Sequence, residues 1–250
     1  MDSPRHPFLD WKGPLPFAHR GGASDVPENT LVAFQYAVDL GYRYLETDVH
    51  VTADGVLVAF HDDDLQRTCG IPGKISELPW SEVSKALVSG KEPIPMLEEL
   101  LATFPDARVN IDCKTNAAVD ALIASLRRTN ALPRVCVAAF SDFRLRRLRK
   151  AFGDQLCSSL GPAELGLLRF GLLRHPPGLA AQVPVKEVIT VVNKAFVERS
   201  HRLGVQVHVW TIDDAPEMER LLDLGVDGIM TDRPAVLRQV LESRGSWHTS

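Results

Sequence analysis

Short runs of apolar and β-branched residues alternate with longer stretches of helical periodicity along almost the whole chain. This alternation is typical of βα units, which place their strands in a parallel sheet, and it disfavours a β-sandwich. Nine runs have the composition of strands, one more than an eight-stranded barrel needs. They cover residues 16–19, 43–49, 56–61, 108–112, 134–140, 155–160, 188–192, 205–211 and 227–231.

Helical segments follow most of these runs. Thr30 can cap a helix whose apolar positions recur every three or four residues until Gly41. Similar patterns cover residues 96–103, 117–129, 142–151, 194–203, 215–224 and 235–243. No GxGxxG turn follows the first strand, so the sequence favours a (β/α)8 TIM barrel over a doubly wound sheet. With 250 residues and 45% hydrophobic content, we expect one domain over 1–250.

The segment 52–55 offers an explanation for the surplus strand, because Asp-Gly between alternating apolar residues is typical of a hairpin. The second and third runs would then be joined without a helix, or one of the nine would be accessory. A tight turn centred on positions 53 and 54 would place Glu46 opposite His61, with Asp48 on the same face. The irregular segment 62–95 is interpreted as a small insertion after the third strand.

The overall charge is weakly acidic, with a formal net charge of −4 and a pI near 6.1. This gives no reason to expect a nucleic-acid partner or an anionic membrane surface, although a local basic patch is compatible with it. The chain has no apolar signal core and no window near the ~18 apolar residues of a membrane span, so we expect a cytoplasmic protein without a transmembrane segment. The four cysteines lie far apart, which favours reduced packing residues over disulfides or zinc.

Polar residues gather at the ends of the predicted strands, where a barrel places its chemistry. Glu46, Asp48 and Asp112 are three carboxylates with no Cys or His among them. All-oxygen ligands suit a hard cation such as Mg²⁺ or Ca²⁺, so we predict that these three bind a metal. The alternative is that Glu46 and Asp48 only form buried salt bridges with Arg20 and Lys114. We favour the metal site, because unpaired charges inside a barrel would cost too much free energy and a metal or ligand relieves them more naturally.

His19 and His61 end separate strands beside these carboxylates. Two imidazoles can divide the work of general base and general acid, so we predict that both are catalytic. Arg20 and Lys114 can neutralise a phosphodiester and the extra charge of its transition state. Trp210 can form an apolar wall for the rest of a substrate, although a tryptophan that ends an apolar run most often packs in a core.

These residues lie in motifs that resemble those of the glycerophosphodiester phosphodiesterases. The motifs are AHRGGASDVPENT at 18–30, LETDVHVTADGVLVAFHDDDLQRT at 45–68, NIDCK at 110–114, VWTID at 209–213 and GVDGIMTDRP at 225–234. They occur in the family's order over nearly the whole chain, and the region 140–205 resembles the family least.

The resemblance implies a (β/α)8 barrel that hydrolyses small glycerophosphodiesters to glycerol 3-phosphate and an alcohol with a divalent cation, Mg²⁺, Ca²⁺ or Mn²⁺. In the family the glycerol 2-hydroxyl is thought to attack first, and water second. The resemblance assigns acid–base roles to His19 and His61, metal binding to Glu46 and Asp48, and phosphate contacts to Arg20 and Lys114.

Two departures from the family's pattern stand out. Many members have a glutamate as third metal ligand where this chain has Asp112, which is one methylene shorter. A strand that often ends in Ser-Phe ends here in Ala139-Phe140, which removes a polar group from that rim. The resemblance further implies that the insertion after His61 corresponds to the family's small capping region.

Other functions remain open at this point. A lysophospholipase D would share the site and need an apolar entrance, for which the segment 163–183 is a candidate, although an ordinary packing helix and loop explains that segment as well. A phosphoinositide-type phospholipase C would not need this carboxylate set. A barrel that only binds phosphoesters would not need both histidines. The head group, the native metal, the order of the two histidines and the oligomeric state stay undetermined.

Overall fold

The computed structural model describes residues 6–185 and 192–249. Within these ranges, eight parallel strands form a nearly closed barrel in the order β8-β7-β6-β2-β1-β11-β10-β9. A single parallel bridge between Ser159 and Ala180 joins the two ends of this order. The barrel strands are β1 (Leu15–His19), β2 (Tyr44–Val51), β6 (Arg108–Cys113), β7 (Val135–Ala138), β8 (Cys157–Ser158), β9 (Ala180–Pro184), β10 (Gln206–Trp210) and β11 (Gly228–Thr231).

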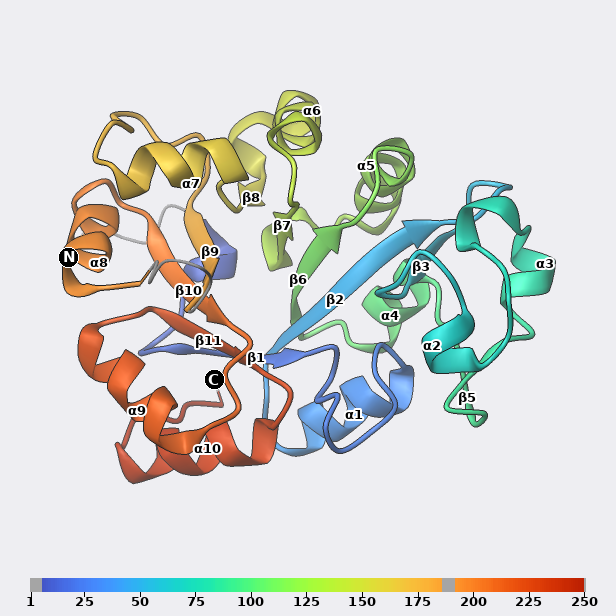
Figure 1. Cartoon of the computed structure of the whole chain (residues 1–250), viewed down its shortest axis with the longest axis horizontal. Helices are drawn as coiled ribbons and strands as arrows, with labels where there is room; N and C mark the ends of the chain where they lie inside the picture. The colour runs from blue at the N-terminus through green and yellow to red at the C-terminus, as the bar shows by residue number, and fades with distance from the viewer. Residues whose placement is uncertain (1–5, 186–191, 250) are drawn as a thin grey trace.

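Helices surround the strands as an outer ring (Figure 1). They are α1 (Leu31–Asp39), α4 (Leu97–Thr103), α5 (Ala118–Thr129), α6 (Asp142–Phe152), α7 (Pro162–Arg169), α8 (Lys194–Arg202), α9 (Ala215–Leu224) and α10 (Pro234–Ser243). Thr30 Oγ1 accepts a hydrogen bond from the Ala33 amide at 3.2 Å, which confirms the predicted cap of α1. The predicted (β/α)8 barrel is therefore confirmed.

One barrel strand was placed wrongly from the sequence. The structure has β9 at Ala180–Pro184, in a segment interpreted as helix and loop. Ala, Gln and Pro give this strand a weak β signal, but it pairs with β10 along its whole length. The strand predicted at 188–192 lies outside the described residues except for Val192, which is not in a strand.

The surplus strand is β3 (Leu57–Ala59), which pairs antiparallel with β2 and lies outside the barrel order. The hairpin is confirmed, but its predicted register is wrong by one residue, because Val51 pairs with Leu57 and the Phe60 amide donates to Asp48 O. Glu46 is therefore not opposite His61. The turn is one residue longer than predicted, and Gly55 at its end has a φ of 88°, which favours glycine.

Residues 62–95 form a compact arm beside the barrel, at the right of Figure 1. The arm contains α2 (Gln66–Cys69), the 3₁₀ turn η2 (Ile75–Glu77), α3 (Trp80–Val83), β4 (Leu87–Val88) and β5 (Glu92–Pro93). Leu65, Ile75 and Val83 pack with Val58 and Phe60 into a hydrophobic cluster separate from those of the barrel.

The barrel is filled at the end where its strands begin. The N-terminal 3₁₀ turn η1 (Pro7–Leu9) places Phe8 against Phe17 and Tyr44, and the Tyr44 hydroxyl donates to Phe8 O at 2.6 Å. Two further 3₁₀ turns, η3 (Leu132–Arg134) and η4 (Gly153–Gln155), precede β7 and β8. The C-terminal ends of the strands are left to form a site.

Among the described residues, no helix has the length and apolar character that crossing a membrane requires.

Candidate active site

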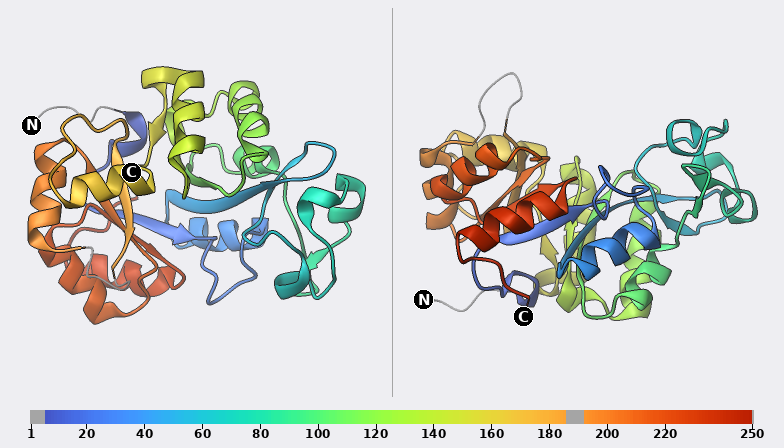
Figure 2. Two further views of the ribbon diagram at one scale, coloured as in Figure 1. Left: turned by 45° about the horizontal axis from the view of Figure 1, so that its top comes forward. Right: turned by 90° about the horizontal axis from the view of Figure 1, so that it is seen from below.

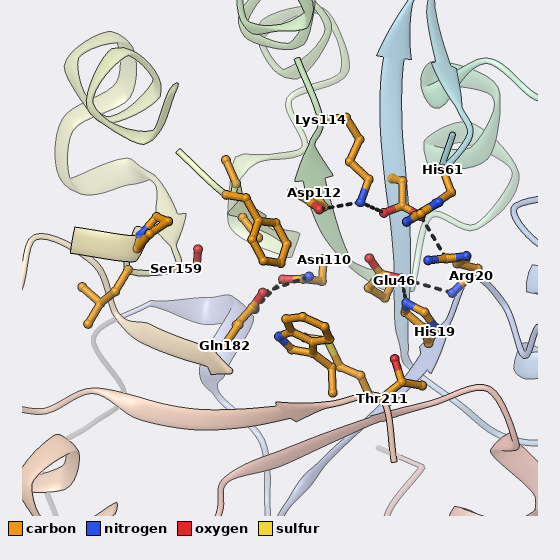
Figure 3. Close-up of a pocket in the computed structure, with 18 of the residues that line it drawn as sticks. His19, Arg20, Glu46, His61, Asn110, Asp112, Lys114, Ser159, Gln182 and Thr211 are labelled. Carbon is orange, nitrogen blue, oxygen red and sulfur yellow. Dashed lines mark hydrogen bonds and ion pairs between the residues drawn. The ribbon is translucent and has the colours of Figure 1, made fainter. Parts of the chain in front are cut away.

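A cavity of about 330 Å³ opens where the barrel strands end. Figure 3 shows polar side chains from β1, β2 and β6 converging on one side of it. All eight site residues predicted from the sequence line this cavity: His19, Arg20, Glu46, Asp48, His61, Asp112, Lys114 and Trp210.

His19 ends β1 and is held by a carboxylate from the far end of the chain. Its Nδ1 lies 2.6 Å from Asp232 Oδ1, and its Nε2 lies 3.8 Å from Glu46 Oε2. Since a carboxylate only accepts, Nδ1 must donate to Asp232. Burial opposes a charge on His19, but the Glu46 and Asp232 carboxylates outweigh it and raise the pKa of the imidazole.

His61 follows β3 and has the same arrangement with its sequence neighbour. Its Nδ1 lies 2.6 Å from Asp62 Oδ1, and Arg67 binds the other oxygen of Asp62. Burial of Asp62 is outweighed by hydrogen bonds from Arg67 and His61, which lower the pKa of the carboxyl to about 2. In both histidines Nδ1 is therefore committed to a carboxylate, and Nε2 is the nitrogen left for chemistry.

The three carboxylates come together through strand geometry. Glu46 and Asp48 alternate on β2 and so share a face, and Asp48 is in register with Asp112 on the neighbouring strand β6. Burial and the nearby Asp48 raise the pKa of Glu46 to about 7. Burial of Asp48 is outweighed by Lys114 and Arg20, which lower the pKa of that carboxyl.

Two cations lie among these carboxylates. Lys114 Nζ is 2.8 Å from Asp48 Oδ1 and 2.9 Å from Asp112 Oδ2. Burial of Lys114 is outweighed by the two carboxylates, which raise the pKa of its ammonium. Arg20 Nε is 3.2 Å from Asp48 Oδ2 without hydrogen-bond geometry, so this contact is an ion pair only. Arg20 also donates a hydrogen bond from Nη1 to Glu28 Oε1 at 3.0 Å.

The three carboxylates fit a metal ion in their chemistry but not in their present arrangement. Among residues 6–185 and 192–249, no three His, Cys, Asp or Glu side chains stand in an arrangement that could hold one, and Lys114 bridges two of the expected ligands. Their chemistry nevertheless fits a hard cation. Within the described part of the chain, Asp112 Oδ1 is buried without a hydrogen-bond partner, and Asp48 lies in register with it on the neighbouring strand.

An apolar wall faces these charges across the cavity. Trp210 at the end of β10 makes an edge contact with Phe140, with ring centroids 5.6 Å apart. Leu160, Leu165 and Met230 also line the cavity. The cavity therefore combines a charged half, which suits a phosphate, with an apolar half.

The sequence did not predict several residues of the site, or predicted no role for them. Asp62 and Asp232 stand at predicted strand ends, but only the structure pairs them with the histidines. Asn29, which the PENT motif contains, donates to Asp48 Oδ2 at 3.1 Å and so orients that carboxylate. Gln182 and Asn110 join their amides across the cavity floor, at 2.7 and 3.3 Å. Gln182 could not be found because its strand was not predicted.

The fold and this cavity define an α/β-barrel hydrolase. A family model described as the glycerophosphoryl diester phosphodiesterase family matches residues 19–236, and the chain belongs to this family. The resemblance seen in the sequence is thus confirmed, and with it the class of phosphoric diester hydrolases. Members of the family generally depend on a divalent cation.

Relatives match along almost their whole length. The chain is 40% identical over 259 residues to probable glycerophosphodiester phosphodiesterase 2 of Mycobacterium tuberculosis, covering 98% of this chain and 97% of the relative. It is 29% identical to a lysophospholipase D from Rattus norvegicus, covering 90% and 85%. A phosphodiesterase from Oleispira antarctica, solved with the product sn-glycerol-3-phosphate, has the same fold with a TM-score of 0.78, 22% identity and coverage of 92% and 97%.

Proposed function

We propose that this cavity hydrolyses glycerophosphodiesters, such as deacylated phospholipids, to glycerol 3-phosphate and an alcohol, with His19 and His61 as the acid–base pair. One observation carries the proposal. Both imidazoles line one cavity, and each donates a hydrogen bond from Nδ1 to a carboxylate oxygen 2.6 Å away. Two histidines held in this way can remove a proton from an attacking hydroxyl and donate one to the departing alkoxide.

The charged half of the cavity would receive the phosphodiester. Arg20 and Lys114 are the cationic donors there, and each is now paired with Asp48. We infer that Glu46, Asp48 and Asp112 hold a divalent cation, Mg²⁺ or Ca²⁺, with Mn²⁺ as an alternative. When bound, this cation supplies neutralising charge for the phosphodiester. Lys114 would then be free to turn from the carboxylates to a phosphate oxygen.

A product assay tests this function. The full chain is incubated with glycerophosphocholine, glycerophosphoethanolamine or glycerophosphoglycerol, each with Mg²⁺, Ca²⁺, Mn²⁺ or EDTA, and glycerol 3-phosphate is measured. We expect product with at least one cation and none with EDTA. Absence of product under every condition would leave a phosphoester-binding protein as the better interpretation.

Two variants test the residues. His19→Ala and His61→Ala should each lower kcat by about 100-fold or more, the usual contribution of a positioned acid or base. His201→Ala is the matched control, because His201 pairs with Asp227 outside the cavity. Turnover near the wild-type rate in either cavity variant would contradict the proposal that the two histidines act as the acid–base pair.

A second candidate function rests on the apolar half. Phe140, Leu160 and Leu165 form a wall that a glycerophosphodiester does not need, and an acyl chain would cover it. We therefore infer that lysophospholipids are alternative substrates, and release of choline from lysophosphatidylcholine tests this. We also infer that the chain acts as one catalytic domain over 1–250 in the cytoplasm.

A further inference from the structure

Exposed apolar side chains are concentrated at one edge of the barrel. Among residues 6–185 and 192–249, eight large hydrophobic side chains are exposed, and five of them lie on α6, α7 or the adjoining loops. Phe170 is the most exposed of these, at 76% of its full surface. We call this set the α6–α7 rim: Phe140, Phe143, Leu167, Phe170 and Leu172.

The two helices that carry the rim are joined to each other. The Asp142 carboxylate at the start of α6 accepts hydrogen bonds from the amides of Ala163 and Glu164 in the first turn of α7. Arg149 of α6 forms an ion pair with Glu164 at 2.7 Å. Figures 1 and 2 show α6 and α7 side by side at the edge of the barrel. The two helices that carry the rim are therefore fixed relative to each other.

This surface runs directly into the mouth of the cavity. Phe140 belongs to both, because it is 61% exposed and also lines the cavity against Trp210. Pro162 and Leu165 of α7 line the cavity as well. A partner that covers the rim would consequently lie at the entrance of the active site.

The segment that carries most of the rim is also strongly basic, in contrast to the chain as a whole. Residues 141–178 contain seven Lys or Arg and three Asp or Glu, a net charge of +4, whereas the whole chain carries −4. Arg147 and Arg149 are paired with Asp120 and Glu164. Five cations of this segment form no ion pair with any described residue: Arg144, Arg146, Lys150, Arg169 and Arg174.

We propose that the α6–α7 rim docks the enzyme onto an anionic lipid bilayer. Protruding Phe and Leu side chains between unpaired Arg and Lys have the character of an interfacial membrane anchor, in which apolar groups enter the acyl boundary and cations meet lipid headgroups. Arg169 and Arg174 flank Phe170 and Leu172 in the sequence. The net charge of −4 does not prevent this, because charges more than about 10 Å away are screened at physiological salt.

Vesicle sedimentation of the full chain tests the docking. Vesicles of phosphatidylcholine alone are compared with an equal mixture of phosphatidylcholine and phosphatidylglycerol. We expect binding to the mixture, little binding to phosphatidylcholine, and release by salt. Arg169→Gln combined with Arg174→Gln should weaken binding about 25-fold, at roughly fivefold per cation. Phe170→Ser combined with Leu172→Ser should weaken it at least about tenfold.

A matched control removes exposed apolar residues elsewhere. Ile71→Ser combined with Leu87→Ser changes side chains that are 42% and 41% exposed on the 62–95 arm, and it should leave vesicle binding unchanged. All variants should hydrolyse water-soluble glycerophosphocholine at the wild-type rate without vesicles, which separates a failure of docking from a failure of the proposed function.

Three results would overturn the docking. The first is equal binding of the wild-type chain to both kinds of vesicle, or to neither. The second is wild-type binding by the rim variants. The third is a concentration-dependent dimer in light scattering that Phe170→Ser dissolves, since the rim would then pair with a second copy of the chain.

Discussion

Nδ1 of His61 lies 2.6 Å from Oδ1 of Asp62, the next residue in the chain, and this carboxyl is held in turn by Arg67. The pair fixes the ring so that Nδ1 donates. Asp62 is not among the residues that line the cavity, so we infer that it acts through His61 as a positioning residue.

Replacing this carboxylate should impair catalysis more than binding. In Asp62→Asn the amide can also offer N–H groups, so the tautomer of His61 is no longer fixed. We expect kcat to fall by about 100-fold with little change in KM. Steady-state kinetics measure this, and Asp63→Asn serves as the neighbouring control. A fall in kcat no larger than that of the control would contradict the positioning role.

Changes at Asp112 should act on the cation. Asp112→Asn removes a charge beside Lys114 and should weaken divalent-cation binding by about 10- to 100-fold. Asp112→Glu restores the longer carboxylate of many family members and should bind at least as tightly as wild type. Titration calorimetry with Mg²⁺ and Ca²⁺ measures binding without turnover. Asp120→Asn, on the exposed face of α5, is the control, and equal affinities in Asp112→Asn and control would remove Asp112 from the ligand set.

Glu28 should matter for substrate binding, because it holds two arginines. It accepts from Arg20 at 3.0 Å and from two nitrogens of Arg67 at 2.8 and 2.7 Å. Burial of Glu28 is outweighed by Arg67 and Arg20, which lower its pKa, so the charge persists at neutral pH. Glu28→Gln should release Arg20 and raise KM about tenfold while kcat changes less. If Glu77→Gln, at an exposed position on the 62–95 arm that carries Arg67, raises KM equally, the effect is not specific.

His208 should make the fold sensitive to acid. Burial lowers the pKa of this imidazole from 6.5 to about 4, against a weak opposing effect of Asp227. Between these values the unfolded chain binds a proton that the folded chain refuses, so the free energy of unfolding should fall by about 3 kcal/mol as pH drops from about 6.5 to about 4. Above pH 7 this contribution is constant.

Urea unfolding over this pH range measures the effect. His208→Gln should lose this part of the pH dependence while other groups keep theirs, so the difference between the two chains should shrink toward low pH. A difference that does not vary with pH would show that His208 is not responsible.

The barrel could be predicted because its helices have strong local signals. The predicted helix at 215–224 coincides with α9, which Asp214 caps by accepting from the Glu217 amide. The strand β9 could not be predicted, because the residues Ala180–Pro184 have little β preference of their own and are stabilised by pairing with β10. Tertiary contacts decided that element.

The site residues could be collected from strand ends, because a barrel brings those ends together. The hydrogen-bond and ion-pair partners of these residues could not be predicted in this way. Asp232 is 213 positions from His19, and no local pattern pairs residues at that distance. The placement of Lys114 between Asp48 and Asp112 likewise depends on the register of β2 and β6, which periodicity does not specify.

The β2–β3 hairpin has a consequence for how such an enzyme can diversify. Since β2 pairs directly with β6, the barrel closes without the arm that the hairpin carries. Residues 62–95 can therefore be lengthened, shortened or exchanged without disturbing the pairing of the barrel strands. His61 directly precedes that arm. An exchanged arm that alters which alcohols reach the cavity can therefore also shift one of the two imidazoles of the site.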